Sequence, residues 1–138
     1  MATITIARFA IVPNSDENII IPKRPPDLPV NDHHFDPFNA PDLDTGTNSA
    51  PPILFFKIEV RNDNANLQVL INGREIVNKQ NLIPAKANTF QEIIGRGVLK
   101  ETGNLVDVIN FNSAGSIVVS DFFVLYQAKV NLGGVIVP

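Results

Sequence analysis

The dipeptide Asn72-Gly73 is the feature that most constrains the fold, because it lies between two runs of strand-like sequence. Positions 67, 69 and 71 before it are all apolar, which is the period of a strand with one face against a core. Asn-Gly is the preferred centre of a type I′ turn, since both central residues need a positive φ. A tight hairpin is therefore predicted, with Ile71 directly opposite Arg74.

A second strand is predicted just before this hairpin. Every second position from 54 to 60 is apolar and shares one face, while Lys57 and Glu59 lie opposite. The polar run 61–66 is rich in Asn and Asp, which favour turns, and it separates this strand from the next. The stretch 53–77 thus reads as strand, turn and hairpin.

Further strands are predicted on both sides of this stretch, at residues 2–12, 18–21, 105–111 and 116–130, with 131–138 as a candidate last strand. Residues 89–94 fit a strand or a short helix, because Thr89 and Glu92 have capping-box spacing. Gly95 and Gly97 would stop such a helix, so we favour the strand. About eight strands predict an all-β fold, an antiparallel β-sandwich or jelly roll.

The run 116–130 is apolar on both faces. Strict alternation places Ile117, Val119, Phe123 and Leu125 on one side, and Val118, Phe122, Val124 and Tyr126 on the other. A strand of this kind is buried on both faces, by its own domain or by another subunit. In residues 2–12 the apolar face changes near Ala7-Arg8, which predicts a bulge, a bend or burial on both sides.

Length and composition fit a single domain spanning residues 1–138. The chain has no Cys, which excludes disulfides and thiolate metal sites. Its net charge of −3 gives no electrostatic reason to expect nucleic acid as a partner. We expect no signal peptide and no membrane span, and the compartment stays undetermined.

Residues 22–52 form a distinct proline-rich and acidic segment. They hold eight of the eleven prolines, and five Asp against two basic residues. Proline excludes a helix or a central strand here, so we expect an extended arm or large loop within the domain. Phe35 and Phe38 are the expected anchors that bury it against a sheet face or a neighbouring subunit.

Two stretches resemble galactose-binding-domain-like jelly rolls, the group that includes many carbohydrate-binding modules. Residues 67–76 (LQVLINGREI) are similar to their Asn-Gly hairpin, and residues 99–106 with 115–126 are similar to their closing strands. The resemblance implies a jelly-roll fold and a glycan ligand bound at loop ends or on a concave face. The chain departs from the group in having no Trp and one Tyr, whereas sugar sites there commonly stack rings on aromatic platforms.

Candidate ligand-binding residues are polar loop groups, namely Asn62, Asp63, Asn64, Asn66, Arg74 and Asn112. The set with metal-ligand chemistry is Asp32, His33, His34 and Asp36. Adjacent His side chains of an extended chain point to opposite sides, so a solvated acidic loop is the simpler interpretation. No cofactor is expected, and a divalent metal such as calcium is compatible with these residues but not expected.

No catalytic set is identified, because both His lie in that cluster and no nucleophile motif occurs. The sequence therefore favours a non-enzymatic binding module, with carbohydrate or glycan as the ligand class. The alternative is a structural assembly subunit, such as a capsid, appendage or injection-machine component, that works as a homo-oligomer. The expected partners are accordingly a glycan or another protein subunit.

Overall fold

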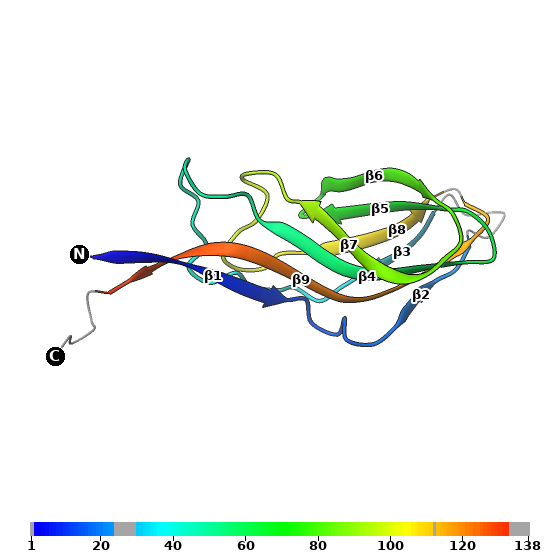
Figure 1. Cartoon of the computed structure of the whole chain (residues 1–138), viewed down its shortest axis with the longest axis horizontal. Coiled ribbons are helices and arrows are strands. Elements are labelled where there is room, and N and C mark those ends of the chain that lie inside the picture. The colour runs from blue at the N-terminus through cyan, green and yellow to red at the C-terminus, as the bar shows by residue number, and fades with distance from the viewer. Residues whose placement is uncertain (1, 24–29, 112, 133–138) are drawn as a thin grey trace.

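The structure is a computed structural model that describes residues 2–23, 30–111 and 113–132. Within these residues, nine strands form two antiparallel sheets that pack as a β-sandwich (Figure 1). The strands are β1 (Thr3–Ile11), β2 (Ile19–Ile21), β3 (Val30–His34), β4 (Ile53–Arg61), β5 (Ala65–Ile71), β6 (Arg74–Leu82), β7 (Ala85–Ile93), β8 (Val106–Phe111) and β9 (Ser116–Asn131).

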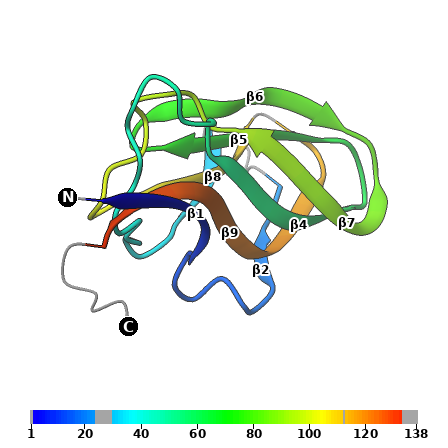
Figure 2. The same cartoon turned by 60° about the vertical axis from the view of Figure 1, so that its left-hand side comes forward.

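The first sheet has the strand order β1-β9-β4-β7, and β2 pairs with the first part of β9 (Figure 2). The second sheet has the order β3-β8-β5-β6. Most consecutive strands lie in different sheets, so each sheet joins residues that are distant in the sequence. The prediction of an all-β antiparallel sandwich is confirmed.

The core lies between the two sheets and contains the alternating side chains of β4 and β5. Leu54 and Phe56 of β4 are at most 1% exposed, and Leu67 and Val69 of β5 are fully buried. The Phe56 ring stacks on Phe122, with the ring centroids 4.6 Å apart. Burying side chains of this size contributes about 1.5–3 kcal/mol each, so this layer fixes which face of each strand is internal.

The Asn72-Gly73 hairpin has the predicted geometry. Both residues have positive φ, 52° and 77°, and Ile71 is paired with Arg74. The Asn72 side chain also donates from Nδ2 to Oδ1 of the buried Asn104, at 3.0 Å. This bond joins the hairpin to the segment that leads into β8.

A β-bulge at Asp121 corrects the predicted alternation of the last strand. Asp121 has a φ of 56°, and the register between β9 and β4 shifts at this point. The core-facing residues of β9 are therefore Ile117, Val119, Phe122, Val124, Tyr126 and Ala128. Phe123 and Leu125, which strict alternation groups with Ile117, lie on the outer face instead.

The first strand is regular along its whole length. Residues 3 to 11 pair with β9 without a register shift, so the bulge, one of the alternatives predicted near Ala7-Arg8, is not present. Ala10 faces the core, whereas Phe9 and Ile11 point outward and are 64% and 74% exposed. The apolar residues after the change of face, Phe9 and Ile11, are thus on the surface, and β1 is not buried on both sides.

The sixth and seventh strands continue through the polar stretch 78–88, for which the sequence predicts no strand. Only Ile83 and Pro84 separate them. The strand prediction for residues 89–94 is confirmed, with β7 ending at Ile93. Both strands lie at sheet edges, where exposure removes the need for apolar side chains.

The described part of the proline-rich segment is hydrogen-bonded to the sandwich. Phe35 and Phe38 are 4% and 3% exposed, which confirms both as anchors. The Phe35 N–H donates to the Val106 carbonyl, and the Phe38 N–H to the Asn104 carbonyl, both at 3.0 Å. The segment also contains β3, which the sequence does not predict, at the edge of the second sheet.

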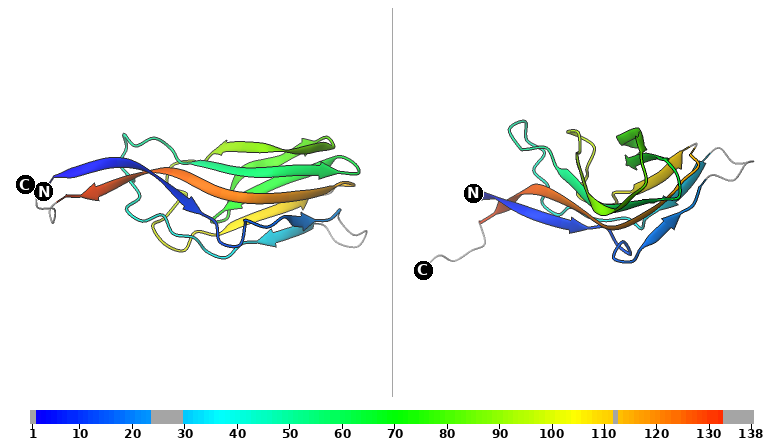
Figure 3. Two further views of the ribbon diagram at one scale, coloured as in Figure 1. Left: turned by 60° about the horizontal axis from the view of Figure 1, so that its bottom comes forward. Right: turned by 45° about the vertical axis from the view of Figure 1, so that its right-hand side comes forward.

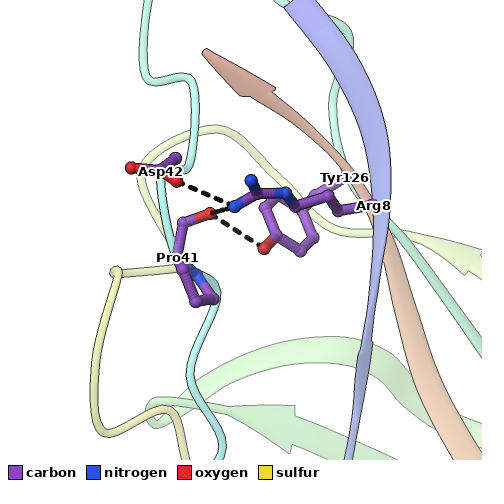
Figure 4. Close-up of polar contacts among 4 residues, drawn as sticks. All are labelled: Arg8, Pro41, Asp42 and Tyr126. Carbon is purple, nitrogen blue, oxygen red and sulfur yellow. Dashed lines mark hydrogen bonds and ion pairs between the residues drawn. The ribbon is translucent and has the colours of Figure 1, made fainter. Parts of the chain in front are cut away.

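Residues 40–44 of the same segment are hydrogen-bonded to β9 and, through side chains, to β1 (Figure 4). Arg8 Nη1 donates to the Pro41 carbonyl (3.1 Å) and to Asp42 Oδ2 (2.8 Å). The Tyr126 hydroxyl donates to the same carbonyl at 2.9 Å. The hydrogen bond to Asp42 raises the pKa of Arg8, and burial raises the pKa of Tyr126. The arm is therefore bound to the inward side of β1 at Arg8.

The β1–β9 pair extends beyond the rest of the sandwich at the end where β1 begins and β9 ends (Figure 3). Residues 133–138, which include most of the candidate last strand, lie outside the described residues. None of the described residues form a helix with the length and apolar character required to cross a membrane.

Candidate functional site

Seven apolar side chains lie next to one another on the outer face of the first sheet, and we call them the outer patch. They are Phe9, Ile11, Ile53, Phe55, Ile93, Phe123 and Leu125. Directly paired residues of neighbouring strands share a face, so strand register defines this set. One row crosses all four strands as Phe9, Leu125, Ile53 and Ile93, and the next as Ile11, Phe123, Phe55 and Gln91.

The centre of the outer patch is a cluster of three phenylalanines. The Phe55 and Phe123 rings are stacked, with centroids 4.9 Å apart and planes within 5°. Phe9 meets Phe123 edge-on at 5.5 Å. Contacts of this kind add about 0.5–1.5 kcal/mol each beyond area burial. The aromatic surface is therefore ordered before any partner binds.

The outer patch is exposed because no described segment covers this face of the sheet. Ile11 is 74% exposed, Phe9 64% and Ile93 63%, while the other four members are half-buried by one another. Single exposed apolar residues are common, but a contiguous apolar set across four strands marks a binding surface.

Polar groups border the outer patch on one side. Lys57 Nζ lies 3.5 Å from Asp121 Oδ2, and Arg61 pairs with Glu59 at 3.0 Å. A cavity of about 390 Å³ opens at the β1 side, lined partly by Phe9, Ile11 and Phe123 and partly by Asp16 and Asp121. The outer patch therefore has charged groups along one border, and charged groups at the border of an apolar surface are common in protein interfaces.

The outer face of the second sheet is polar by comparison. His34 lies between Asp107, which contacts Nδ1, and Asp32, whose Oδ2 is 2.9 Å from Nε2. The hydrogen bond to Asp107 is the main cause that raises the pKa of His34. Gln68 Nε2 donates to Glu75 Oε1 at 2.8 Å on the same face. These side chains bond to one another. The outward apolar residues of this face that the structure describes include Ile109, which lies opposite Asp32 and Gln68, and Leu70, which lies opposite Asp107 and Glu75.

The predicted ligand-binding residues do not form one site. Asn62, Asp63 and Asn64 lie together in the loop between β4 and β5. Arg74 starts β6 at the far end of β5, whose seven residues span roughly 23 Å. Asn66 lies in β5 itself, paired in register with Asn81, and Asn112 lies outside the described residues.

The four candidate metal ligands are also separated. Asp32 and His34 contact each other, but His33 points away and packs on the Phe35 ring, with centroids 4.6 Å apart. Asp36 accepts a hydrogen bond from Asn14 Nδ2 at 2.7 Å. Among the described residues there is no group of three or more His, Asp or Glu arranged to hold a metal ion. The geometry gives the metal prediction no support.

Sequence reasoning missed the outer patch, although part of its signal was present. The apolar residues at positions 9, 11, 53, 55, 93, 123 and 125 lie opposite the core positions of their strands. They could have been grouped only with the strand order and the bulge at Asp121 known.

No protein-family model matches the chain. No curated protein matches it either. Among solved structures, the chain is similar to the CBM36-1 domain of a multidomain xylanase from the hindgut metagenome of Trinervitermes trinervoides, with 7% sequence identity. The match covers 87% of this chain and 96% of that one, with a TM-score of 0.45. A likeness at this level concerns the type of fold alone.

Proposed function

We propose that the protein is a non-enzymatic assembly subunit, which associates with further copies of itself through the outer patch. The observation that carries this proposal is a contiguous apolar surface across four strands, with exposures of 63% to 74% at Phe9, Ile11 and Ile93. The outer patch contains no charged side chain, so covering it removes no ionic group from water. Association is therefore favoured by the hydrophobic effect without an electrostatic cost.

The outer patch occupies the stretch in which all four strands of the first sheet overlap, which is residues 9–11 of β1 and 53–55 of β4. Four strands of about 4.8 Å spacing and roughly four residues of about 3.3 Å rise give a projected area of about 250 Å². A two-fold contact over the outer patch buries about 500 Å² in this projection, so an interface of specific size, above roughly 1,200 Å², also includes residues around the outer patch. Moving one exposed Phe or Ile side chain fully out of water contributes about 1.5–3 kcal/mol.

The first prediction is that replacing the aromatic centre abolishes association. The double variant Phe9→Ser with Phe55→Ser removes two rings of the outer patch, and at least a hundredfold weaker self-association is expected. Sedimentation equilibrium over a range of concentrations measures this directly. The matched control is Phe111→Ser, which makes the same change on the outer face of the second sheet.

Retained association by the control and loss by the double variant support the proposal. A wild-type protein that stays monomeric at high micromolar concentration contradicts it, as does a double variant that associates like the wild type. Circular dichroism of each variant establishes that the loss does not come from unfolding.

Glycan binding is the second candidate, and one observation favours it. The near-parallel Phe55 and Phe123 rings lie in the same strands as Lys57 and Asp121, so an aromatic surface and hydrogen-bonding groups are close together. Sugar rings bind through stacking and hydrogen bonds of this kind. A glycan array with calorimetry on any hits separates the two candidates, because binding lost in Phe55→Ser and unaffected by protein concentration favours the glycan.

A further inference from the structure

The outward edge of β1 carries a row of backbone groups with no strand beside it in the described residues. Leu132 N–H donates to the Ala2 carbonyl, and Val12 N–H to the Phe122 carbonyl. Hydrogen-bonded and non-hydrogen-bonded pairs alternate along an antiparallel ladder. The even-numbered residues of β1 therefore bond to β9. The odd residues, from Thr3 to Ile11, direct their N–H and C=O groups to the free edge.

This edge has few of the protections that sheet edges usually have. β1 contains no Pro, Lys or bulge, and the charge of its one inward-pointing basic residue, Arg8, is paired with Asp42 within the same copy. The other edge of the same sheet, β7, carries Lys86 and Glu92. In the second sheet β6 is charged, and β3 has five residues including Asp32 and two His. β2, which pairs with β9 on the same side as β1, is an edge of only three residues. Among the described edge strands, β1 is therefore the long one without charged side chains on its outer face.

The side chains of β1 also continue the outer patch to this edge. Phe9 and Ile11 belong to the outer patch and lie on the strand whose edge is free. A strand added beside β1 would meet their exposed sides with its own outward residues. The outer patch and the edge together offer more contact area than the outer patch by itself, which is smaller than a specific interface needs.

We propose that the edge of β1 pairs antiparallel with β1 of a second copy, so that two first sheets join into one continuous sheet. This inference rests on the proposed function and gives it a geometry. Because the contact is two-fold, both β1 edges are used and the pairing closes as a dimer instead of growing into a fibre. Two outer patches then form one surface of twice the width, available for further copies.

The register of the pair follows from the sequence of β1. All nine residues are paired only when Ala7 lies opposite Ala7 of the second copy. Phe9 then faces Thr5 across the pair, and Ile11 faces Thr3. Arg8 lies opposite Ile6, so the two Arg8 residues are not directly paired and like charges are kept apart. Ala7 is a residue of the hydrogen-bonded type, for which the two Cα atoms are about 5.5 Å apart.

Disulfide formation between introduced cysteines tests this register directly. The chain contains no Cys of its own, so no native thiol competes. Two Cys at the Ala7 position would have a Cα separation within the range of disulfides, about 4.4–6.8 Å. We expect Ala7→Cys to form a covalent dimer almost completely with oxidised glutathione, on non-reducing gels. The matched control is Ala87→Cys, an exposed alanine on the β7 edge of the same sheet, which should stay monomeric.

A second variant tests the pairing without a covalent cross-link. Ala7→Lys places two ammonium groups face to face at the two-fold axis and should weaken dimerisation at least tenfold by sedimentation equilibrium, whereas Ala87→Lys should not. Failure of Ala7→Cys to cross-link, or equal cross-linking by Ala87→Cys, overturns the edge pairing. If Ala7→Lys associates normally while the Phe9 and Phe55 double variant does not, the outer patch is retained as the interface and the edge is rejected. A monomeric wild type rejects both.

Discussion

At the residue scale, His34 is a histidine whose pKa the fold raises. It lies between Asp107 and Asp32, and these carboxylates raise its pKa above the usual value of about 6.5. The proton is therefore held more tightly in the folded state than in the unfolded chain. The resulting stabilisation is fully present below about pH 6.5 and is lost as the pH rises through the folded-state pKa.

The second prediction concerns this pH dependence. In wild type, the stabilisation provided by His34 should decrease from about pH 5 to pH 8, and His34→Gln should remove that decrease. The side chain is 68% exposed, so the effect should stay below about 1 kcal/mol. Urea denaturation at the two pH values measures it. His33→Gln serves as the control, because His33 packs on Phe35 away from both carboxylates. An unchanged pH profile in His34→Gln would contradict the assignment.

At the element scale, the bulge at Asp121 decides which side chains of β9 enter the core. It lets Val119 and Phe122 face inward, although they are three positions apart. Without the extra residue, strict alternation would place either Ile117 and Val119 or Phe122 and Val124 on the surface. The same bulge directs Phe123 outward into the outer patch. The extra residue therefore determines both which side chains of β9 enter the core and which join the outer patch.

The third prediction tests the backbone at this bulge. Asp121 has a φ of 56°, where a β-branched side chain is strained and Gly is not. Asp121→Val should therefore be less stable than Asp121→Gly by about 1–2 kcal/mol. Both variants lose the carboxylate near Lys57. The difference between their free energies of unfolding, measured by urea denaturation, therefore comes from the backbone conformation at position 121. Equal stability of the two variants would argue against a left-handed conformation at this position.

At the scale of the whole molecule, the two outer faces of the sandwich have different characters. The second sheet presents paired polar groups such as His34 with Asp107 and Gln68 with Glu75. The first sheet presents the outer patch, whose members carry no charge. An interface built on the first face should be hydrophobic in its response to solution conditions, whereas one built on the second would be ionic.

The fourth prediction follows from this difference. Raising the NaCl concentration from about 0.05 to 0.5 M shortens the screening length several-fold, yet the self-association constant should change by less than about threefold. Sulfate should strengthen association, because it favours burial of apolar surface. Sedimentation equilibrium in the two salts measures both effects. Dissociation by NaCl would instead assign the contact to charged residues such as Lys57 or Glu59.

Local sequence determined the hairpin, most strand positions and the class of fold. Asn72-Gly73 specifies its turn through backbone sterics, and the alternation in β4 and β5 specifies their core faces through the hydrophobic effect. Phe35 and Phe38 were also identified as anchors of the proline-rich segment, because large apolar side chains in a polar context must be buried to order it. These properties depend on residues near one another in the chain.

Only the tertiary structure decided the candidate site. The outer patch combines β1, β4, β7 and β9, and their adjacency comes from strand order, which no local pattern encodes. The polar candidates Asn62 and Arg74 are separated because β5 runs the length of the sandwich between them. The free edge of β1 is likewise a property of the assembled sheet. Its sequence differs little from that of a central strand, and the open edge results from which strand the fold places last.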